Sequence, residues 1–164
     1  MVAAALAAAT RLGAQTTATF LEYHTTVPAA WESRKPSSTS RLAEYVVPNA
    51  GEIVVYFFGK GQGGNVDANV TRWRGQFSTA DGSPVPESVT RDSTGAFPIT
   101  FAEFRGNYRR GLGNGSADSV RAGQTLVASI VETPHGTLYI QFFGPSAGVA
   151  AQKDAFVKFV KALK

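Results

Sequence analysis

The sequence predicts an α+β domain in which an antiparallel β-sheet is flanked by helices. Short runs of β-favouring residues are separated by turns rich in proline, glycine and asparagine, and strands joined by such short turns run antiparallel. Two other segments, 65–77 and 146–163, repeat apolar residues every three or four positions, as an amphipathic helix does. The predicted order is strands, helix, four strands, helix.

The stretch 52–77 is the centre of this prediction. Residues 53–58 are six consecutive β-favouring residues, which indicates a buried strand. Four glycines within 59–64 end that strand, and Asn65 is a suitable N-cap for the helix that follows. The helix carries one apolar stripe, in which we expect Trp73 to be a core anchor. The stripe consists of Val66, Val70, Trp73 and Phe77.

The remaining elements follow from the same signals in chain order. Before the central helix, we expect strands at 19–27, 31–35 and 41–47, the last of which forms a hairpin with 53–58. After it, we expect strands at 88–92, 97–108, 125–132 and 137–143, a long glycine-rich surface loop at 109–123, and the closing helix. The strands 125–132 and 137–143 form a second hairpin.

The first fifteen residues are interpreted separately from the fold. Residues 2–9 are apolar and rich in alanine, and small residues follow, which is typical of the end of a secretory signal. We therefore expect residues 1–15 to be a signal-peptide remnant, with cleavage near Ala14 or Gln15, and 16–164 to be a single domain. This predicts an exported bacterial protein, periplasmic or extracellular. The alternative is a short N-terminal helix of the mature fold.

Composition limits the function classes. The 164 residues are 43% hydrophobic and 17% charged, which is ordinary for a globular protein. The net charge of +4 is mild and the basic residues are scattered, so we expect no nucleic-acid partner. The chain has no cysteine, which excludes disulfides and thiolate chemistry. No apolar run reaches membrane-spanning length, so we expect no stable membrane insertion. We also expect a monomer.

A "strand, proline, small residues, tryptophan" opening stands at 27–31, and the glycine loop is followed by Arg72 and Trp73. These motifs resemble those of PsbP-like domains, which include an extrinsic photosystem subunit and a Ran-binding nuclear import factor, and the glycine loop with Arg72 and Trp73 is the most specific part. The resemblance is nearest to uncharacterised exported bacterial proteins of that fold. It implies a PsbP-like layered sandwich, and it transfers no function because such domains bind unrelated partners. The matching segments are 27–31, 35–38, 41–43, 56–59, 61–64, 66–70, 72–73, 76–77 and 81–82.

The glycine loop 59–64 stands between a strand and a helix, which is the local setting of a dinucleotide-binding loop. Its glycine spacing differs from that motif, no strand ending in an acidic residue follows, and no Walker lysine is present. We therefore expect no cofactor. Two interpretations stay open: an anion contact at the helix start by Asn65, or a mobile connection.

Gly144-Pro145-Ser146-Ala147-Gly148 matches the G-x-S-x-G motif of a nucleophilic serine. A small serine hydrolase using Ser146 with His24 or His135 is therefore the alternative function. However, both histidines precede Ser146 in the chain, and a simpler role is to cap the closing helix. Two histidines and scattered carboxylates also predict no metal site.

Arginines just before and near both ends of the loop 109–123 suit carboxylate or phosphate recognition. The main hypothesis is a non-enzymatic binding or accessory module for a protein partner or a small anionic ligand. If the glycine-rich loops 59–64 and 109–123 reach the same end of the sheet, we expect them to form one site. The candidate ligand-binding residues are Lys60, Asn65, Arg105, Arg109, Arg110 and Arg121.

Overall fold

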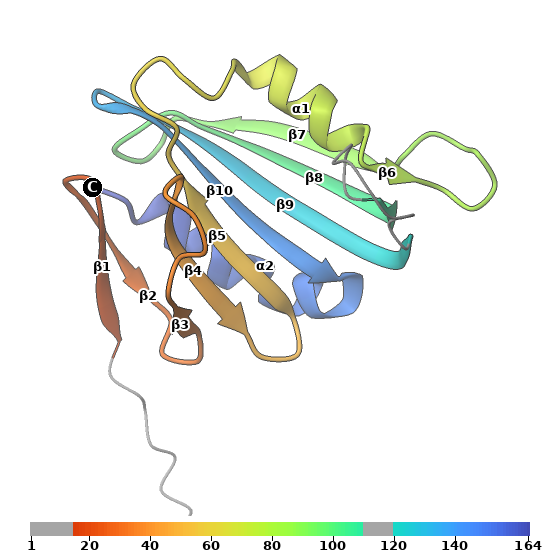
Figure 1. Ribbon diagram of the computed structural model, residues 1–164, viewed down its shortest axis with the longest axis horizontal. Coiled ribbons are helices and arrows are strands. Elements are labelled where there is room, and N and C mark those ends of the chain that lie inside the picture. Colours follow the sequence, from red (N-terminus) through yellow and green to blue (C-terminus); the bar gives the residue numbers. More distant parts are fainter. Residues whose placement is uncertain (1–14, 110–119) are drawn as a thin grey trace, which may run out of the picture.

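The computed structural model describes residues 15–109 and 120–164, which form ten strands and two helices (Figure 1). In chain order the elements are β1 (Thr16–Phe20), β2 (Tyr23–Val27), β3 (Glu32–Arg34), β4 (Arg41–Val47), β5 (Gly51–Tyr56), α1 (Val66–Arg74), β6 (Phe77–Ser78), β7 (Glu87–Asp92), β8 (Ile99–Tyr108), β9 (Arg121–Thr133), β10 (Gly136–Pro145) and α2 (Ser146–Lys161).

The larger sheet has eight antiparallel strands in the order β3-β4-β5-β10-β9-β8-β6, and β7 pairs with β8 on the same side as β6. The chain reaches the far edge by passing through α1, and then returns as the meander β7-β8-β9-β10 until β10 pairs with β5. The predicted α+β class, with an antiparallel sheet flanked by helices, is confirmed. The two predicted hairpins, β4–β5 and β9–β10, are also confirmed.

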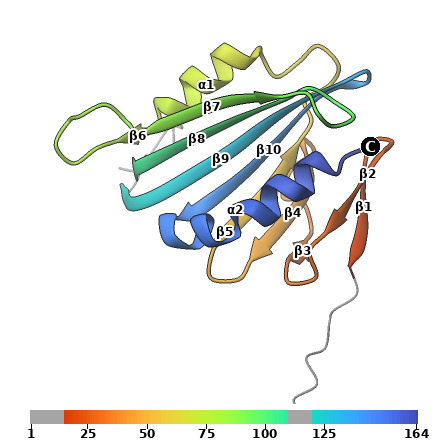
Figure 2. The ribbon, with the colours of Figure 1, turned by 180° about the vertical axis from the view of Figure 1, so that it is seen from behind.

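The closing helix α2 covers one face of the sheet (Figure 2). Because side chains alternate along a strand, Leu138, Ile140 and Phe142 of β10 point to this face. They pack in one cluster with Phe156 and Phe159 of α2. This cluster is the larger part of the hydrophobic core.

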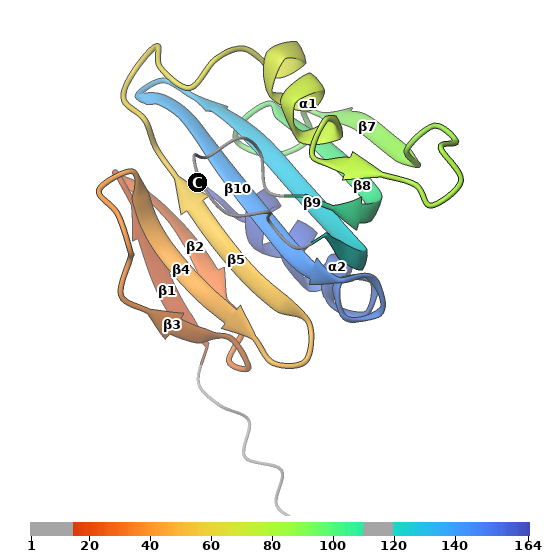
Figure 3. The same ribbon diagram turned by 45° about the vertical axis from the view of Figure 1, so that its right-hand side comes forward.

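The other face carries α1, which lies over β8 and β9 and away from β4 and β5 (Figure 3). Val70 and Trp73 of the helix and Phe77 just after it are buried against these strands. Trp73 is only 2% exposed, so its prediction as a core anchor is confirmed. A helix of nine residues is too short to cover the whole sheet, and α1 leaves the β4–β5–β10 part of this face uncovered.

The N-terminal segment differs from the prediction of one strand over 19–27. It forms a separate hairpin, β1–β2, whose turn holds Leu21 at φ 58°. Leucine rarely adopts a positive φ, so a leucine at this position does not predict a turn. The hairpin packs Phe20 against Phe159 of α2 with ring centroids 6.1 Å apart, and the His24 N–H donates to the Lys164 carbonyl at 3.0 Å.

Candidate functional site

An open groove of about 540 Å³ occupies the part of the α1 face that the helix leaves uncovered. Its walls come from β4, β5, α1, β8, β9 and β10, so it joins segments that are far apart in the sequence. Of the described residues, three arginines line it, Arg41, Arg72 and Arg121, and we call it the arginine groove. Glu52 is the only acidic residue among the described residues that line it.

Aromatic rings form much of the floor. Tyr56 is the last residue of β5, Phe58 follows two residues later, and their rings are stacked with centroids 5.8 Å apart. Phe58 is 43% exposed, which is unusual for a residue of this size. Nearer the other end, Tyr108 and Phe143 lie with centroids 4.4 Å apart.

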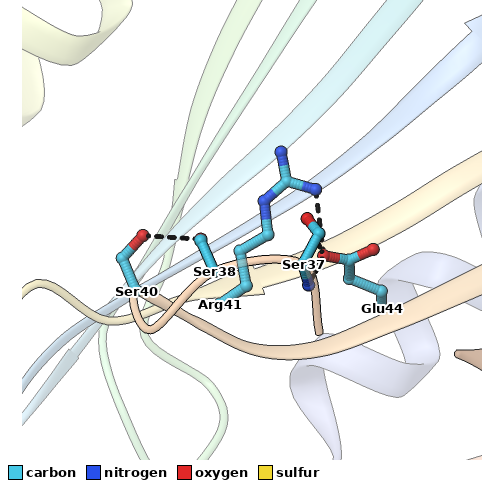
Figure 4. Close-up of polar contacts among 5 residues, drawn as sticks. All are labelled: Ser37, Ser38, Ser40, Arg41 and Glu44. Carbon is cyan, nitrogen blue, oxygen red and sulfur yellow. Dashed lines mark hydrogen bonds and ion pairs between the residues drawn. The ribbon is translucent and has the colours of Figure 1, made fainter. Parts of the chain in front are cut away.

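Arg41 enters the groove from β4, and its orientation is fixed by Glu44 (Figure 4). One terminal nitrogen of Arg41 donates to Glu44 Oε1 at 3.0 Å, and the guanidinium lies 5.4 Å from the centre of the Tyr56 ring. The backbone N–H and hydroxyl of Ser37 both donate to the same oxygen at 2.7 Å, and with Arg41 they hold the pKa of Glu44 below its ordinary value. The other terminal nitrogen of Arg41 points away from Glu44.

Arg72 enters from α1, and its orientation is fixed by a buried amide. It donates to Asn69 Oδ1 at 2.6 Å, and its guanidinium lies 6.0 Å from the Trp73 ring centre. Asn69 is 2% exposed, and its amide nitrogen donates to the carbonyls of Gly63 at 2.8 Å and Asn65 at 2.9 Å. The glycine loop therefore positions Arg72 indirectly.

Arg121 is the first residue of β9 and stands opposite Tyr108 of β8. It is exposed, and within the described residues it makes no ion pair. The side-chain amides of Gln76 and Gln141 also line the groove. The arrangement offers guanidinium and amide donors above an aromatic floor, with net positive charge.

Among the described residues, the structure does not bring the candidate residues of the two glycine-rich loops together. Lys60 lies beside the β9–β10 turn, because a Cβ added at Gly136 would be 3.2 Å from Lys60 Cα. Arg105, Arg109 and Arg121 lie at the opposite end of β8 and β9, where Thr125 pairs with Arg105. The whole length of β10 separates the two ends. Of the predicted residues only Arg121 lines the arginine groove, and Arg110 falls outside the described residues.

The other predicted residues have local roles. Asn65 caps α1, since its Oδ1 accepts from the Ala68 N–H at 2.8 Å. The small hollow beside this helix start is lined by Asp67 and Glu132 against one cation, Arg91, so the charge of its described lining is net negative and does not favour an anion. Arg105 pairs with Glu103 at 3.0 Å.

The glycine loop is held in place by Tyr139 of β10. The Tyr139 hydroxyl donates to the Gly64 carbonyl at 2.8 Å. A Cβ at Gly63 would lie 2.6 Å from this ring, and Gly63 has φ 93°, so both space and backbone geometry require glycine there. The loop therefore covers a buried tyrosine, which accounts for Gly63 without a nucleotide phosphate.

The prediction that Ser146 caps the closing helix is wrong. Pro145 is the N-cap residue, and Ser146 is the first residue of α2. The Ser146 hydroxyl accepts from Thr125 Oγ1 at 2.8 Å and donates to the Gly123 carbonyl at 2.9 Å. It therefore ties the start of α2 to the start of β9.

The glycines of the G-x-S-x-G motif are explained by close packing rather than by a nucleophile elbow. A Cβ at Gly144 would lie 2.1 Å from the Ala50 carbonyl oxygen, and one at Gly148 would lie 2.5 Å from Ala50 Cα. These glycines let the β4–β5 turn approach the junction of β10 and α2.

Both histidines lie far from Ser146. His24 pairs with Lys164, beyond the other end of the sixteen-residue helix α2, which is roughly 24 Å long. His135 stands in the turn before β10, at the opposite end of that strand from Ser146, and pairs with Glu22 at 2.7 Å. No serine–histidine pair is formed at Ser146.

No group of three or more histidine, cysteine or acidic residues among those that the structure describes is placed to hold a metal ion. No described helix is both long and apolar enough to cross a membrane.

Comparison with known proteins identifies the fold. No protein-family model and no curated protein matches the chain. Among solved structures, cyanobacterial PsbP (CyanoP) from Synechocystis is similar over 98% of this chain and 97% of its own, with a TM-score of 0.59. The fold is PsbP-like. At 10% sequence identity this similarity establishes the PsbP-like fold alone, and confirms that part of the resemblance noted in the sequence.

A second solved structure shows a weaker similarity. PA94 from Pseudomonas aeruginosa, a protein of unknown function, is 12% identical over 93% of this chain and 97% of its own, with a TM-score of 0.43. That score is too low to support an argument about the PsbP-like fold or its function.

Sequence reasoning missed Arg41 and Arg72 as members of a site. Arg41 was expected only as part of a strand, and Arg72 only as part of the helix beside Trp73. The available signal was their aromatic neighbours: Arg41 stands opposite Tyr56 across β4 and β5, and Arg72 precedes Trp73. Using it would have required the register of β4 on β5, which a bulge between Arg41 and Ala43 shifts.

Proposed function

We propose that this chain is an exported, non-enzymatic binding module that holds an anionic partner, a protein or a small molecule, in the arginine groove. The observation that carries the proposal is the position of three arginines from three different elements around one open, aromatic-floored groove. Two of them, Arg41 and Arg72, are oriented by hydrogen bonds to Glu44 and Asn69.

The chemistry of the lining favours a carboxylate or a phosphate. A guanidinium presents a planar fork of donors that matches either group, and it also stacks on aromatic faces. The groove volume falls in the range of about 300–1,000 Å³ that is usual for ligand sites. The net charge of +4 would also draw anionic partners toward the protein.

The absence of an acid–base pair favours binding over catalysis. Among the described lining residues, the one carboxylate, Glu52, has neither a histidine nor a serine beside it in the groove. A nucleophilic mechanism needs a nucleophile with a base within hydrogen-bond reach, and the described lining holds no serine–histidine or serine–carboxylate pair. The surroundings of Ser146 give no support to the hydrolase alternative.

The binding part of the proposal can be tested with two variants of equal charge. The groove variant carries Arg41→Gln, Arg72→Gln and Arg121→Gln, and the control carries Arg34→Gln, Arg91→Gln and Arg105→Gln, all of which lie outside the groove. Calorimetric titration with phthalate and with poly-L-glutamate should show binding by the wild type and the control and its loss in the groove variant. If the groove variant binds as tightly as the control, the binding site lies outside the arginine groove.

Export is proposed from residues 1–15 alone. Mass spectrometry of the protein recovered from its native host should show a mature N-terminus within a few residues of Thr16. An abundant cytoplasmic form that retains Met1 would contradict export without affecting the groove.

A further inference from the structure

We infer, resting on the proposed function, that the occupant of the arginine groove is an extended acidic segment of a partner protein. The segment is about six to nine residues long and carries at least one aromatic or large apolar side chain. Four features of the groove carry this inference: its length, the composition of its walls, its exposed phenylalanine and the charge of the chain itself.

The length follows from strand register. Arg41 stands level with Tyr56, which pairs with Tyr139 near the start of β10. Arg121 lies three residues beyond Gln124, which pairs with Pro145 at the end of β10. A bulge adds one residue to β9 between Gln124 and Arg121, so the two arginines lie about eight residue rises apart along the strands, or roughly 26 Å.

Charges spaced in this way do not suit a compact anion. One phosphate or one carboxylate can contact the arginine at one end of the groove but not the arginine at the other. The guanidinium groups can lie closer together than the Cα atoms, because arginine side chains are long. An extended chain rises about 3.3 Å per residue, so six to nine residues span the distance between the charges.

The polar residues of the walls favour a peptide over other polyanions. Glu52 lies in the groove with a carboxylate that repels a densely charged strand such as nucleic acid or a polyuronate. A peptide carries N–H groups that can donate hydrogen bonds to the Glu52 carboxylate, and carbonyl groups to which the amides of Gln76 and Gln141 can donate. A peptide with intermittent acidic side chains can therefore pair these side chains with the arginines and place its backbone N–H groups beside Glu52.

Phe58 indicates the apolar part of the ligand. It is 43% exposed at the end of the groove nearest Tyr139, and its ring stacks with Tyr56. A further aromatic or large apolar side chain placed on Phe58 would remove that surface from water, which is favourable in proportion to the area covered.

A second copy of the same chain does not fit this description. Each copy carries a net charge of +4, so two copies repel each other. The twelve acidic residues of the chain are never adjacent in the sequence, so it has no segment of concentrated negative charge to offer. The partner is therefore a different protein.

A series of labelled synthetic peptides tests the inference. The peptides alternate glutamate with glycine around a central phenylalanine, with lengths of about three, six, nine and twelve residues, chosen from the rise of an extended chain. In fluorescence anisotropy titrations with the full-length protein, affinity should increase with length up to about nine residues and then level off. A nine-residue peptide with glutamine in place of glutamate should bind at least about tenfold more weakly.

Single variants at the two ends test the predicted span. Arg41→Gln and Arg121→Gln should each weaken the nine-residue peptide by about tenfold, whereas Arg105→Gln, an exposed arginine outside the groove, should leave affinity unchanged. Arg121 has no ion pair to lose within the described residues, so its variant keeps the test valid if Arg41→Gln disturbs the fold.

Other results separate this inference from the proposed function. If phthalate or the three-residue peptide binds the groove as tightly as the nine-residue peptide, the extended segment is wrong and an anion site remains. Tighter groove-dependent binding of oligothymidylate or alginate would likewise overturn the peptide and leave the anion site. If none of these probes binds in a way that depends on Arg41 or Arg121, both proposals fail.

Discussion

At the scale of single residues, Arg72 and Trp73 are adjacent on α1 but have different surroundings. Arg72 is exposed in the arginine groove, whereas Trp73 is 2% exposed and packs on β8 and β9. The helical stripe predicted this burial, because residues three and four apart on a helix share one face. It could not predict the groove, because the sequence does not show how wide a strip of sheet the helix covers.

Truncating Trp73 should therefore affect stability strongly. We expect Trp73→Ala to lower the free energy of unfolding by about 3–5 kcal/mol in a denaturant titration. In a Trp31→Phe background, Trp73 emission should resist quenching by iodide. Trp31 is a suitable residue to replace, since its indole nitrogen has no hydrogen-bond partner in the described part of the chain. Ready quenching would show that Trp73 is accessible after all.

Asp92 is a residue through which acid should weaken the fold. Lys161 of α2 donates to its carboxylate at 2.7 Å, and the hydroxyl and N–H of Thr94 donate to it as well, so its pKa is held well below the ordinary value of 3.8. Since the folded state lowers this pKa, the contribution to stability is complete above about pH 4 and is lost as the pH falls further.

The expected measurement is a series of melting temperatures between about pH 2 and pH 6. Asp92→Asn should melt lower than the wild type near pH 6, and the difference should shrink as the pH falls. Asp154→Asn, an exposed residue of α2, makes the same change in charge and serves as the control. A constant difference between Asp92→Asn and wild type across the range would contradict the ionic role.

At the scale of elements, the G-x-S-x-G segment is a packing junction between β10, α2 and the β4–β5 turn. Adding one methyl group at Gly144 would place it 2.1 Å from the Ala50 carbonyl, which the backbone cannot accommodate without moving. Gly144→Ala should cost at least about 1–3 kcal/mol of unfolding free energy. Gly75→Ala is the matched control, because its new Cβ would lie 3.5 Å from the nearest atoms, at an ordinary contact distance. Equal stability of both variants would refute the close approach.

Ser146 should matter for stability only. Ser146→Ala removes the hydroxyl that joins Thr125 and Gly123, and it should cost about 1 kcal/mol. A fluorophosphonate probe should fail to label the wild type at this position. Covalent labelling of Ser146 would restore the hydrolase hypothesis.

Most elements could be predicted from the sequence because their signals are local. Strands 41–47, 88–92 and 137–143 are bounded by prolines, glycines and polar turn residues, and each was found close to its observed position. The β1–β2 turn was missed because Leu21 adopts a positive φ that leucine seldom shows. The arginine groove was missed because it depends on non-local pairing, in which β5 joins β10 across more than eighty residues of chain.

At the scale of the whole molecule, the described fold begins at Thr16, immediately after the segment interpreted as a signal remnant. In β1, Thr16 already pairs with Val27, and the side chain of Phe20 is 2% exposed against the α2 core. A chain that starts at Thr16 therefore keeps every described element. A chain that starts at Leu21 loses β1 and exposes the surface that Phe20 covers.

These two truncations should behave very differently in thermal denaturation. The chain 16–164 should melt within a few degrees of the full chain, because it loses no strand and no buried residue among those described. The chain 21–164 should lose roughly the 3–5 kcal/mol of a buried phenylalanine, which lowers the melting temperature by about 10 °C in a domain of this size. Phe20→Ala in the full chain should reproduce most of that loss, since it removes the contact with Phe159 but keeps the backbone of β1. If 16–164 melts as low as 21–164, then residues 1–15 contribute to the fold, and their interpretation as a removable leader is wrong.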